Sequence, residues 1–531
     1  MKKARIIIAL SLLLSLLAGC AAAAGTESTS EPSSVAAEST APGDAGEILV
    51  SFTDGGITAS AAENLEMDGT ALTITGAGTY VLSGSCANGS VKVKKGVTGV
   101  RLVLSSLHLS SESTAPILCG KGTQVTIEAA AGTESTLADT EKNSDGSGNV
   151  DAENAVIKCK DGSAVVLCGS GTLNLQANGK NGIKSGASTT EDGDAALTIR
   201  DLTLNIDAPV NDAINAEAAL AVESGSLTIS AADDALHCDC TLTIGAEGTD
   251  GPDIMVASCY EGLEGAAVNV LSGNISILST DDCINAANSD LTGYDFALNI
   301  SGGTIVACSD TGDGFDSNGD LTISGGTVTV WTGSTADNEP LDADGKITVS
   351  GGTVLAAGGS SGMGMNLEAA QPCVIFGGSG AAEMPGGFLQ PGQGGAPGGN
   401  SQADRNPGQE GQSGGEARPG QGSFPGAQAS LLKEGSAFTL CKEDGTVLYT
   451  ADAACSASYL FFSSGDLASG ESYTLCTEDS QTESSAQSGT IVSGMGGGQR
   501  PEGPPPTGGF GSQKQDGSTP PEQPGGSSGT V

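Results

Sequence analysis

The sequence predicts an all-β protein built as a parallel β-helix, and three features of the 531-residue chain support this fold class. First, a four-residue pattern recurs every 21 to 31 residues between residues 181 and 342: an acidic or amide residue, a small residue, a large apolar residue and a polar residue. Second, a strand–glycine corner–strand pattern accompanies it, most clearly at residues 321–328 and 347–354. Third, each repeat must hold three short strands, which leaves no room for a useful helix.

A recurring period with loops of unequal length favours strands that pair with their counterparts one coil away, and therefore a stack of parallel strands. An antiparallel β-sandwich array is the alternative. The large apolar residue of each pattern is expected to face the core. These residues are Ile183, Ile214, Leu236, Leu263, Ile284, Phe315 and Leu341, with a fainter copy at Met365.

The first twenty residues predict a lipoprotein signal peptide. Three basic residues precede an apolar stretch at 6–17 that is too short to span a bilayer permanently. The sequence Leu17–Cys20 resembles the lipobox of bacterial lipoproteins, which implies that Cys20 is lipidated. We therefore expect a protein anchored to the cell membrane through its lipid and facing the extracellular side.

Composition divides the rest of the chain. The predicted segments are a disordered stalk at 21–45, the β-helix at 46–383, a Gly/Pro/Gln-rich linker at 384–428, a small β module at 429–478 and a disordered Gly/Pro-rich tail at 479–531. Clear strand patterns begin near Leu72. The β module is expected to cap the helix, because an exposed last coil would offer a bare sheet edge.

Charge and cysteine usage narrow the function. The net charge of −42 excludes a nucleic-acid-binding surface, which needs a cationic face. Besides Cys20 there are 13 cysteines, an odd number that cannot pair completely within one chain. We interpret Cys238, Cys259, Cys283 and Cys308 as small core residues, where neighbouring repeats carry Ala, Ser or Gly. The sequence contains no CxxC pair, so a zinc site or a disulfide framework is a weak alternative.

Stacking would bring the polar residues of the pattern together. By the two-residue period of a strand, one row should point outward: Lys184, Asn215, His237, Glu264, Asn285, Asp316, Asp342 and Asn366. The turn before each strand contributes a second row: Asn181, Asp212, Asp234, Glu261, Asp282, Asp313 and Glu339. Asp233 and Asp281 double two of these turns.

Carboxylates about 5 Å apart repel by roughly 3 kcal/mol at an effective dielectric of 20. Exposed aspartates are not expected to protonate at neutral pH, and Arg200 is the only basic residue between Ser185 and Gly345 apart from His237. A bound cation would neutralise the rows, and oxygen ligands select calcium. Solvated stacked turns without metal are the alternative.

The search for catalytic residues finds little. Lys184 is the weak candidate for a lyase base, against the simpler interpretation as a solvated lysine. His237 is a lone histidine on a coil, and the pair Glu261 and Glu264 fits either glycoside hydrolysis or calcium binding. We expect no catalytic residue.

Three segments together resemble the core of a bacterial cell-surface lipoprotein family described as carbohydrate-binding. They are Tyr260–Gly265, the corner at 272–275 and residues 281–285. Residues 78–82 and 115–117 fit the first coils of that family, and the resemblance covers roughly residues 46–380. It implies a right-handed parallel β-helix, similar in fold to the pectate lyases of polysaccharide lyase family 9.

The resemblance also implies calcium and a plant cell-wall polysaccharide, either cellulose or a polygalacturonate such as pectin. The calcium candidates carried over by motif are Asp212, Asp234, Glu261, Glu264, Asp282, Asp313 and Asp316. Pro340 departs from the small-residue rule and puts its turn in doubt.

We therefore expect a monomeric, non-catalytic repeat protein that binds polysaccharide at the cell surface. The candidate carbohydrate-binding residues are Asn215, His237, Asn285, Tyr260, Trp331 and Asp342. A calcium-dependent pectate lyase and a surface adhesin or structural rod are the alternatives.

Overall fold

The computed structural model describes residues 46–190, 193–288, 291, 294–333, 338–359, 366–377 and 430–492. These all belong to the first of two units of the chain, residues 1–495. The predicted signal peptide, the lipid site Cys20, the stalk, the linker and Met365 lie outside the described residues.

The described residues are almost entirely β. They form a 34-stranded, mostly parallel sheet and a four-stranded antiparallel sheet, with one 3-10 helix at Asp145–Ser147 and no α-helix. The predicted all-β class is confirmed. Within the described part of the chain, no helix is long and apolar enough to cross a bilayer.

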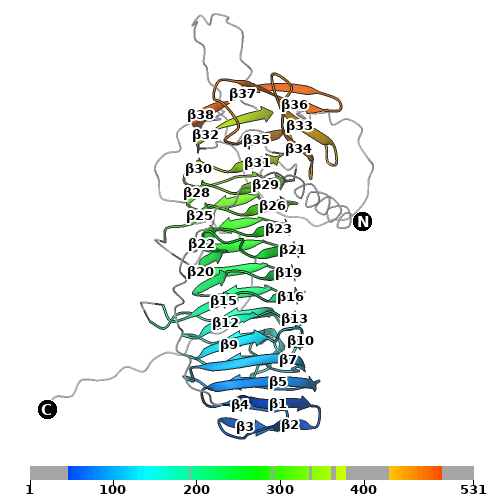
Figure 1. The fold of residues 1–531 in the computed structure, drawn as a ribbon, viewed down its shortest axis with the longest axis vertical. Coiled ribbons are helices and arrows are strands. Elements are labelled where there is room, and N and C mark those ends of the chain that lie inside the picture. Colours follow the sequence, from blue (N-terminus) through cyan, green and yellow to red (C-terminus); the bar gives the residue numbers. More distant parts are fainter. Residues whose placement is uncertain are drawn as a thin grey trace, which may run out of the picture. The chain divides into compact units, whose positions relative to one another are not determined.

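Most strands of the large sheet lie in three files, in which they pair in parallel with strands of the neighbouring repeats. Figure 1 shows these strands stacked along the longest axis. The first file carries the acidic pattern. Its members are β4 (Ala71–Ile74), β6 (Ser90–Val93), β8 (Ile117–Cys119), β11 (Ala155–Cys159), β14 (Asn181–Ser185), β17 (Ile214–Ala216), the start of β20 (Leu236–Ile244), the start of β22 (Leu263–Val270), β24 (Ile284–Ala286) and β27 (Phe315–Ser317).

The other two files complete each repeat. The second file holds β1 (Ile48–Thr53), the starts of β5 (Gly78–Cys86) and β7 (Val100–Ser110), β9 (Gln124–Ala129), β12 (Ala164–Gly169), β15 (Ala196–Ile199), β18 (Ala219–Val222), the ends of β20 and β22, β25 (Ala297–Ile300), β28 (Asp320–Ile323), β30 (Ile347–Val349) and β32 (Asn366–Gly377). The third file holds the ends of β5 and β7, β10 (Glu134–Ala138), β13 (Thr172–Gln176), β16 (Thr203–Ala208), β19 (Ser226–Ala231), β21 (Asp253–Cys259), β23 (Asn274–Ser279), β26 (Thr304–Ser309), β29 (Thr327–Thr332) and β31 (Thr353–Gly358).

The stack begins earlier than the strand patterns near Leu72 suggested. Strand β2 (Gly56–Ala59) pairs antiparallel with β1, and β3 (Leu65–Asp68) pairs antiparallel with β4. These two hairpins stand at the first coil. Strands β2 and β3 are only four residues long, which gives little pattern to recognise in the sequence.

The core lies inside the three files, and the predicted inward residues fill it. Ile183, Ile214, Leu236, Leu263, Ile284 and Phe315 are all fully buried, and Leu341 is 1% exposed. They occupy equivalent positions in successive strands of the first file. The prediction that these residues face one continuous apolar core is confirmed.

The glycine corners keep the turns thin enough to stack. Gly326 and Gly352 have φ angles of +85° and +82°, a left-handed conformation that favours glycine. A Cβ atom at the preceding Gly325 would lie 2.3 Å from the carbonyl oxygen of Ser301 in the coil before. A side chain at either position would therefore push two coils apart.

The last coils meet the C-terminal segment. Strand β35 (Tyr459–Ser463) pairs antiparallel with β31 and β32, and β38 (Gln487–Val492) pairs with β32. The four-stranded sheet contains β33 (Ala437–Lys442), β34 (Val447–Asp452), β36 (Ser472–Thr477) and β37 (Gln481–Ser485). Because β37 and β38 lie beyond residue 478, the predicted start of the disordered tail at 479 is wrong. Strand β37 consists of polar residues, and a strand at the edge of a sheet tolerates them.

Candidate functional site

The first file aligns the predicted outer residues in one row. Strand pairing places Lys184, Asn215, His237, Glu264, Asn285 and Asp316 side by side in that order, and the Phe315–Leu341 bridge continues the file towards Asp342. We call these seven residues the outer row. Successive members are about 4.8 Å apart because that is the spacing of paired strands.

The turn before each strand is stacked as regularly. The backbone carbonyl of each pattern's first residue accepts a hydrogen bond from the coil before it, as Asp212 does from Gly182 and Asp282 from Gly262. The same ladder includes Asp234, Glu261, Asp313 and Glu339, and these residues with Asn181 form the turn row. The Pro340 turn keeps the ladder, since its carbonyl accepts from Phe315. The doubt about that turn is thereby answered.

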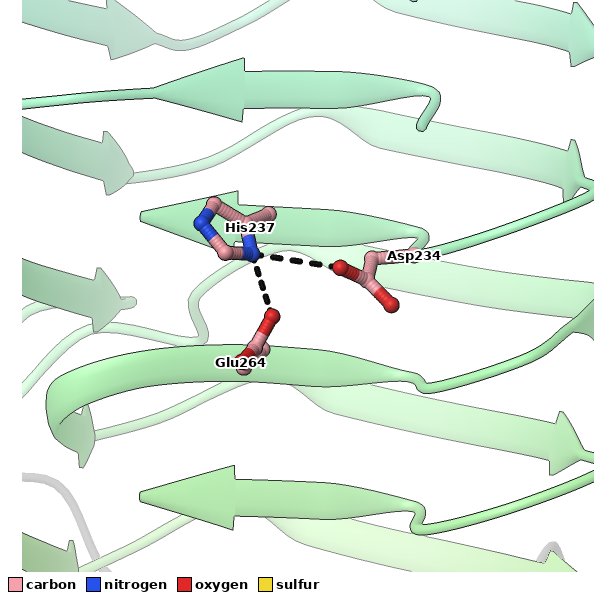
Figure 2. Close-up of side chains that lie close together, drawn as sticks. All are labelled: Asp234, His237 and Glu264. Carbon is pink, nitrogen blue, oxygen red and sulfur yellow. Dashed lines mark hydrogen bonds and ion pairs between the residues drawn. The ribbon is translucent and has the colours of Figure 1, made fainter. Parts of the chain in front are cut away.

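Asp234, His237 and Glu264 meet where the two rows adjoin (Figure 2). The Nδ1 atom of His237 lies 3.1 Å from a carboxylate oxygen of Asp234 and also contacts Glu264. Its Nε2 atom lies 2.9 Å from Asp239. Burial alone would lower the pKa of His237, but these three carboxylates outweigh burial and raise the pKa. The three carboxylates thus favour the charged form of the histidine.

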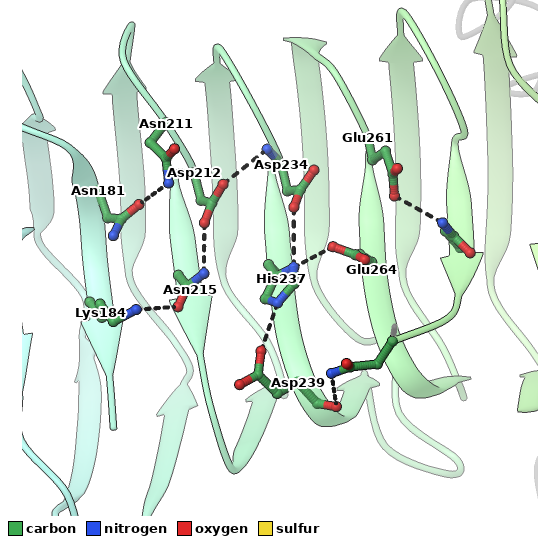
Figure 3. A network of polar contacts seen from close by, with 12 residues as sticks. Asn181, Lys184, Asn211, Asp212, Asn215, Asp234, His237, Asp239, Glu261 and Glu264 are labelled. Carbon is green, nitrogen blue, oxygen red and sulfur yellow. Dashed lines mark hydrogen bonds and ion pairs between the residues drawn. The ribbon is translucent and has the colours of Figure 1, made fainter. Parts of the chain in front are cut away.

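Next to this cluster, the rows are linked by amide side chains (Figure 3). Asn215 donates to Asp212 at 2.7 Å and accepts from the Nζ of Lys184 at 3.1 Å. Lys184 also lies 3.6 Å from Glu217. These contacts hold Lys184 in place as a structural cation, and its position gives no direct support for a catalytic base.

A third group lies three coils further along. Asp313, Asp316 and Asp342 bring one carboxylate oxygen each within 4.8 Å of one another. We call this group the aspartate cluster. The backbone amide of Asp313 donates to Asp282 at 2.7 Å, so the neighbouring turn is fixed by the carboxylate before it. The cluster contains oxygen donors only.

The acids of the two rows are partly buried, which corrects the expectation that they are exposed and fully ionised. Burial, then nearby carboxylates, raise the pKa of Glu261 to about 8. Burial also raises the pKa of Asp282 and Asp316 to about 6 and of Asp313 to about 7. Protonation therefore competes with cation binding as a way to neutralise the rows near neutral pH.

The aspartate cluster fits calcium best. Calcium takes six to eight oxygen ligands, and three carboxylates can supply most of them. Asn285, 9% exposed, is paired in register with Asp316, and its Oδ1 atom is buried without a hydrogen-bond partner among the described residues. The Asp234–His237–Glu264 cluster fits less well, because a nitrogen already bonded to both acids occupies its centre.

The structure separates the seven predicted calcium ligands. Asp313 and Asp316 share one cluster, and Asp234 and Glu264 share another with His237. Asp212 groups with Asp233 and Asp234. Glu261 instead accepts a hydrogen bond from Asn285 at 3.1 Å, and Asp282 accepts one from the next turn.

The predicted sugar-binding residues differ in accessibility. Tyr260 is 45% exposed, whereas Asn215 and His237 are half-buried and engaged with neighbouring side chains. Trp331 is fully buried, with its ring centroid 6.1 Å from that of Phe438 in the C-terminal sheet. The prediction that Trp331 binds sugar is wrong, because a segment more than 100 residues later covers the outer face of its strand.

The sequence did not predict the contacts of four polar residues of the site. Asp342 was predicted to bind sugar and instead belongs to the aspartate cluster. Asp233 was predicted only to add a second acid to its turn, and it groups with Asp212 and Asp234. Asp239 follows His237 by two residues, a spacing that returns to the same strand face. Lys158 precedes Lys184 in register, and burial, then Lys184, lower the pKa of Lys158. Its motif was too divergent to be recognised as a repeat.

The comparison with protein families agrees with a carbohydrate-binding class. A family model described as "Carbohydrate-binding domain-containing protein" matches residues 68–362, more than half of the chain. The chain belongs to this family. No curated protein matches the chain. One similar solved structure is described as "Structure of the polysaccharide lyase-like protein from C. thermocellum, Gadolinium derivative"; it shares 22% identity, with 58% of this chain and 93% of that chain covered and a TM-score of 0.32.

Proposed function

We propose that this chain is a non-catalytic surface lipoprotein, anchored at Cys20, that binds an acidic plant polysaccharide through calcium. The stack is inferred to be a right-handed parallel β-helix with three strands per coil. Family membership supports carbohydrate as the ligand. The aspartate cluster carries the calcium proposal, since it joins three carboxylates. Asn285, in register with Asp316, adds a buried Oδ1 atom that has no hydrogen-bond partner among the described residues.

Polygalacturonate is favoured over cellulose. A cellulose-binding surface relies on exposed aromatic rings, and the only tryptophan of the chain is buried. Calcium held by carboxylates on one side can accept carboxylates of a uronate polymer on the other, because calcium accommodates many oxygen ligands in flexible geometry. An acidic protein can thereby hold an acidic polymer.

Affinity electrophoresis tests the proposal. The protein is expected to be retarded in gels containing polygalacturonate and calcium, and to migrate freely with EDTA or in gels containing hydroxyethylcellulose. The double variant Asp313→Asn/Asp316→Asn should lose retardation. Glu247→Gln/Asp250→Asn removes two exposed charges from a loop outside the rows and should behave like the wild type.

Three results would contradict the proposal. Retardation that persists in EDTA would show that binding does not need calcium. Absence of retardation in every polysaccharide would favour an adhesin or structural rod. Unsaturated uronide products after long incubation would favour the lyase, with Lys184→Ala as the variant expected to abolish them.

A further inference from the structure

Two cysteine sulfur atoms from distant parts of the chain face each other beside the last coils. The Sγ atom of Cys308 in β26 lies 3.2 Å from the Sγ atom of Cys455, 147 residues later. Cys455 stands between β34 and β35, in the segment that pairs with the end of the stack. Cys308 is 6% exposed and Cys455 is half-buried. The contact therefore joins a repeat strand to the C-terminal segment.

Cys308 occupies a position where the adjoining repeats carry large apolar residues. In register it pairs with Leu278 before it and Trp331 after it. The sequence-based interpretation of Cys308 as a small filler matched by Ala, Ser or Gly is therefore wrong. The shorter side chain leaves room that Cys455 approaches, in an apolar cluster shared by Trp331 and Phe438.

We propose that Cys308 and Cys455 form a disulfide that fastens the C-terminal segment to the stack. The two sulfur atoms must approach by about 1.2 Å to reach the length of an S–S bond, about 2.05 Å. Side-chain motion within the contact can supply this. The inference does not depend on the proposed calcium site or on the carbohydrate.

The oxidation is a thiol–disulfide exchange with a small-molecule disulfide or a disulfide oxidoreductase. The thiolate of Cys455, the more accessible sulfur, attacks the reagent disulfide and releases one thiol. Cys308 loses its proton and attacks the Cys455 sulfur of the mixed disulfide, which releases the second thiol. Two protein thiols are oxidised and one reagent disulfide is reduced to two thiols. Contact with Cys455 and burial raise the pKa of Cys308, so Cys308 ionises less readily and is not the sulfur that attacks the reagent first.

The thiol pair of the first file lacks this arrangement. Cys119 and Cys159 are neighbours in register within the first file, and both are fully buried, so a reagent does not reach them without unfolding. A bond between them would link only adjacent coils. The Cys308–Cys455 bond would instead close a loop of 147 residues, and long loops are those in which a disulfide restricts the unfolded chain most.

The test uses the full chain equilibrated with reduced and oxidised glutathione, followed by alkylation and non-reducing peptide mapping. We expect a linked peptide containing Cys308 and Cys455, absent from Cys455→Ser and retained in Cys168→Ser, which removes another half-buried thiol. Recovery of Cys455 only as a glutathione adduct, as alkylated thiol or linked to another cysteine would overturn the proposal.

Urea unfolding supplies a second readout. Oxidised wild-type protein should have a higher unfolding midpoint than reduced wild-type protein, and Cys168→Ser should show the same difference. If Cys455→Ser does not fold, the comparison of oxidised with reduced wild-type protein still tests the proposal. A linked peptide without any midpoint shift would refute the fastening role.

Discussion

Replacement of Asp316 by asparagine should stabilise the protein without calcium and reduce the stabilisation that calcium provides. Three carboxylates of the aspartate cluster have oxygen atoms within 4.8 Å of one another. Two unit charges at about this distance repel by about 3 kcal/mol at an effective dielectric of 20. Asp316→Asn removes two of the three repulsive pairs, and solvent screening with partial protonation reduces the expected gain to about 1–3 kcal/mol at pH 8.

Calcium should reduce this advantage. A ligand at 100 times its Kd stabilises the native state by about 2.7 kcal/mol, and a tenfold weaker site loses about 1.4 kcal/mol of that stabilisation. We therefore expect Asp316→Asn to be more stable than wild type in EDTA and to gain less from calcium.

Urea titration at pH 8, followed by far-ultraviolet circular dichroism and Trp331 fluorescence, measures both differences. Glu247→Gln/Asp250→Asn is the matched control and should gain as much from calcium as the wild type. The reasoning is refuted if Asp316→Asn is destabilised in EDTA, or if its gain from calcium equals that of the wild type.

Three further predictions concern buried groups. Burial raises the pKa of Asp139, so its contribution to stability is full below about pH 4, the pKa of the unfolded state, and declines as pH rises through the folded pKa. In urea titrations, the stability difference between wild type and Asp139→Asn should therefore shrink as pH rises over that range. A constant difference would contradict this prediction. The same variant places an amide donor against the Nδ2 donor of Asn143, now 2.8 Å from a carboxylate oxygen, and should cost about 1–3 kcal/mol at neutral pH. His237→Ala leaves buried acids without their cation and should cost about 3–5 kcal/mol, with partial rescue by Glu264→Gln in a double-mutant cycle; additive effects would argue against the contact. Trp331→Phe should leave polysaccharide retardation unchanged, and wild-type tryptophan emission should be insensitive to acrylamide and to polymer, whereas quenching by polymer would place Trp331 at the ligand.

The sequence was sufficient to predict the register of the first file. A strand has a strict two-residue period, so the spacing between Ile183 and Lys184, repeated at Phe315 and Asp316, assigned inward and outward positions correctly. Stacking of the acids followed from the same repeat. The handedness and the ion remain proposals.

Contacts between distant segments could not be read from the repeat. Trp331 and Cys308 alternate outward as polar residues do, yet the C-terminal segment covers both. Burial of the acids was missed for a related reason, because the exposure of Asp313 depends on how closely adjacent turns pack and not on its own motif. Local periodicity specifies which way a side chain points, and tertiary packing decides what it meets.

Isothermal titration of a defined oligogalacturonate into the protein tests the central claim most directly. With calcium present, we expect saturable heat for the wild type and for Glu247→Gln/Asp250→Asn, and none for Asp313→Asn/Asp316→Asn or for the wild type in EDTA. Equal binding in EDTA, or full binding by the double aspartate variant, would contradict a calcium-bridged polysaccharide site on the outer row.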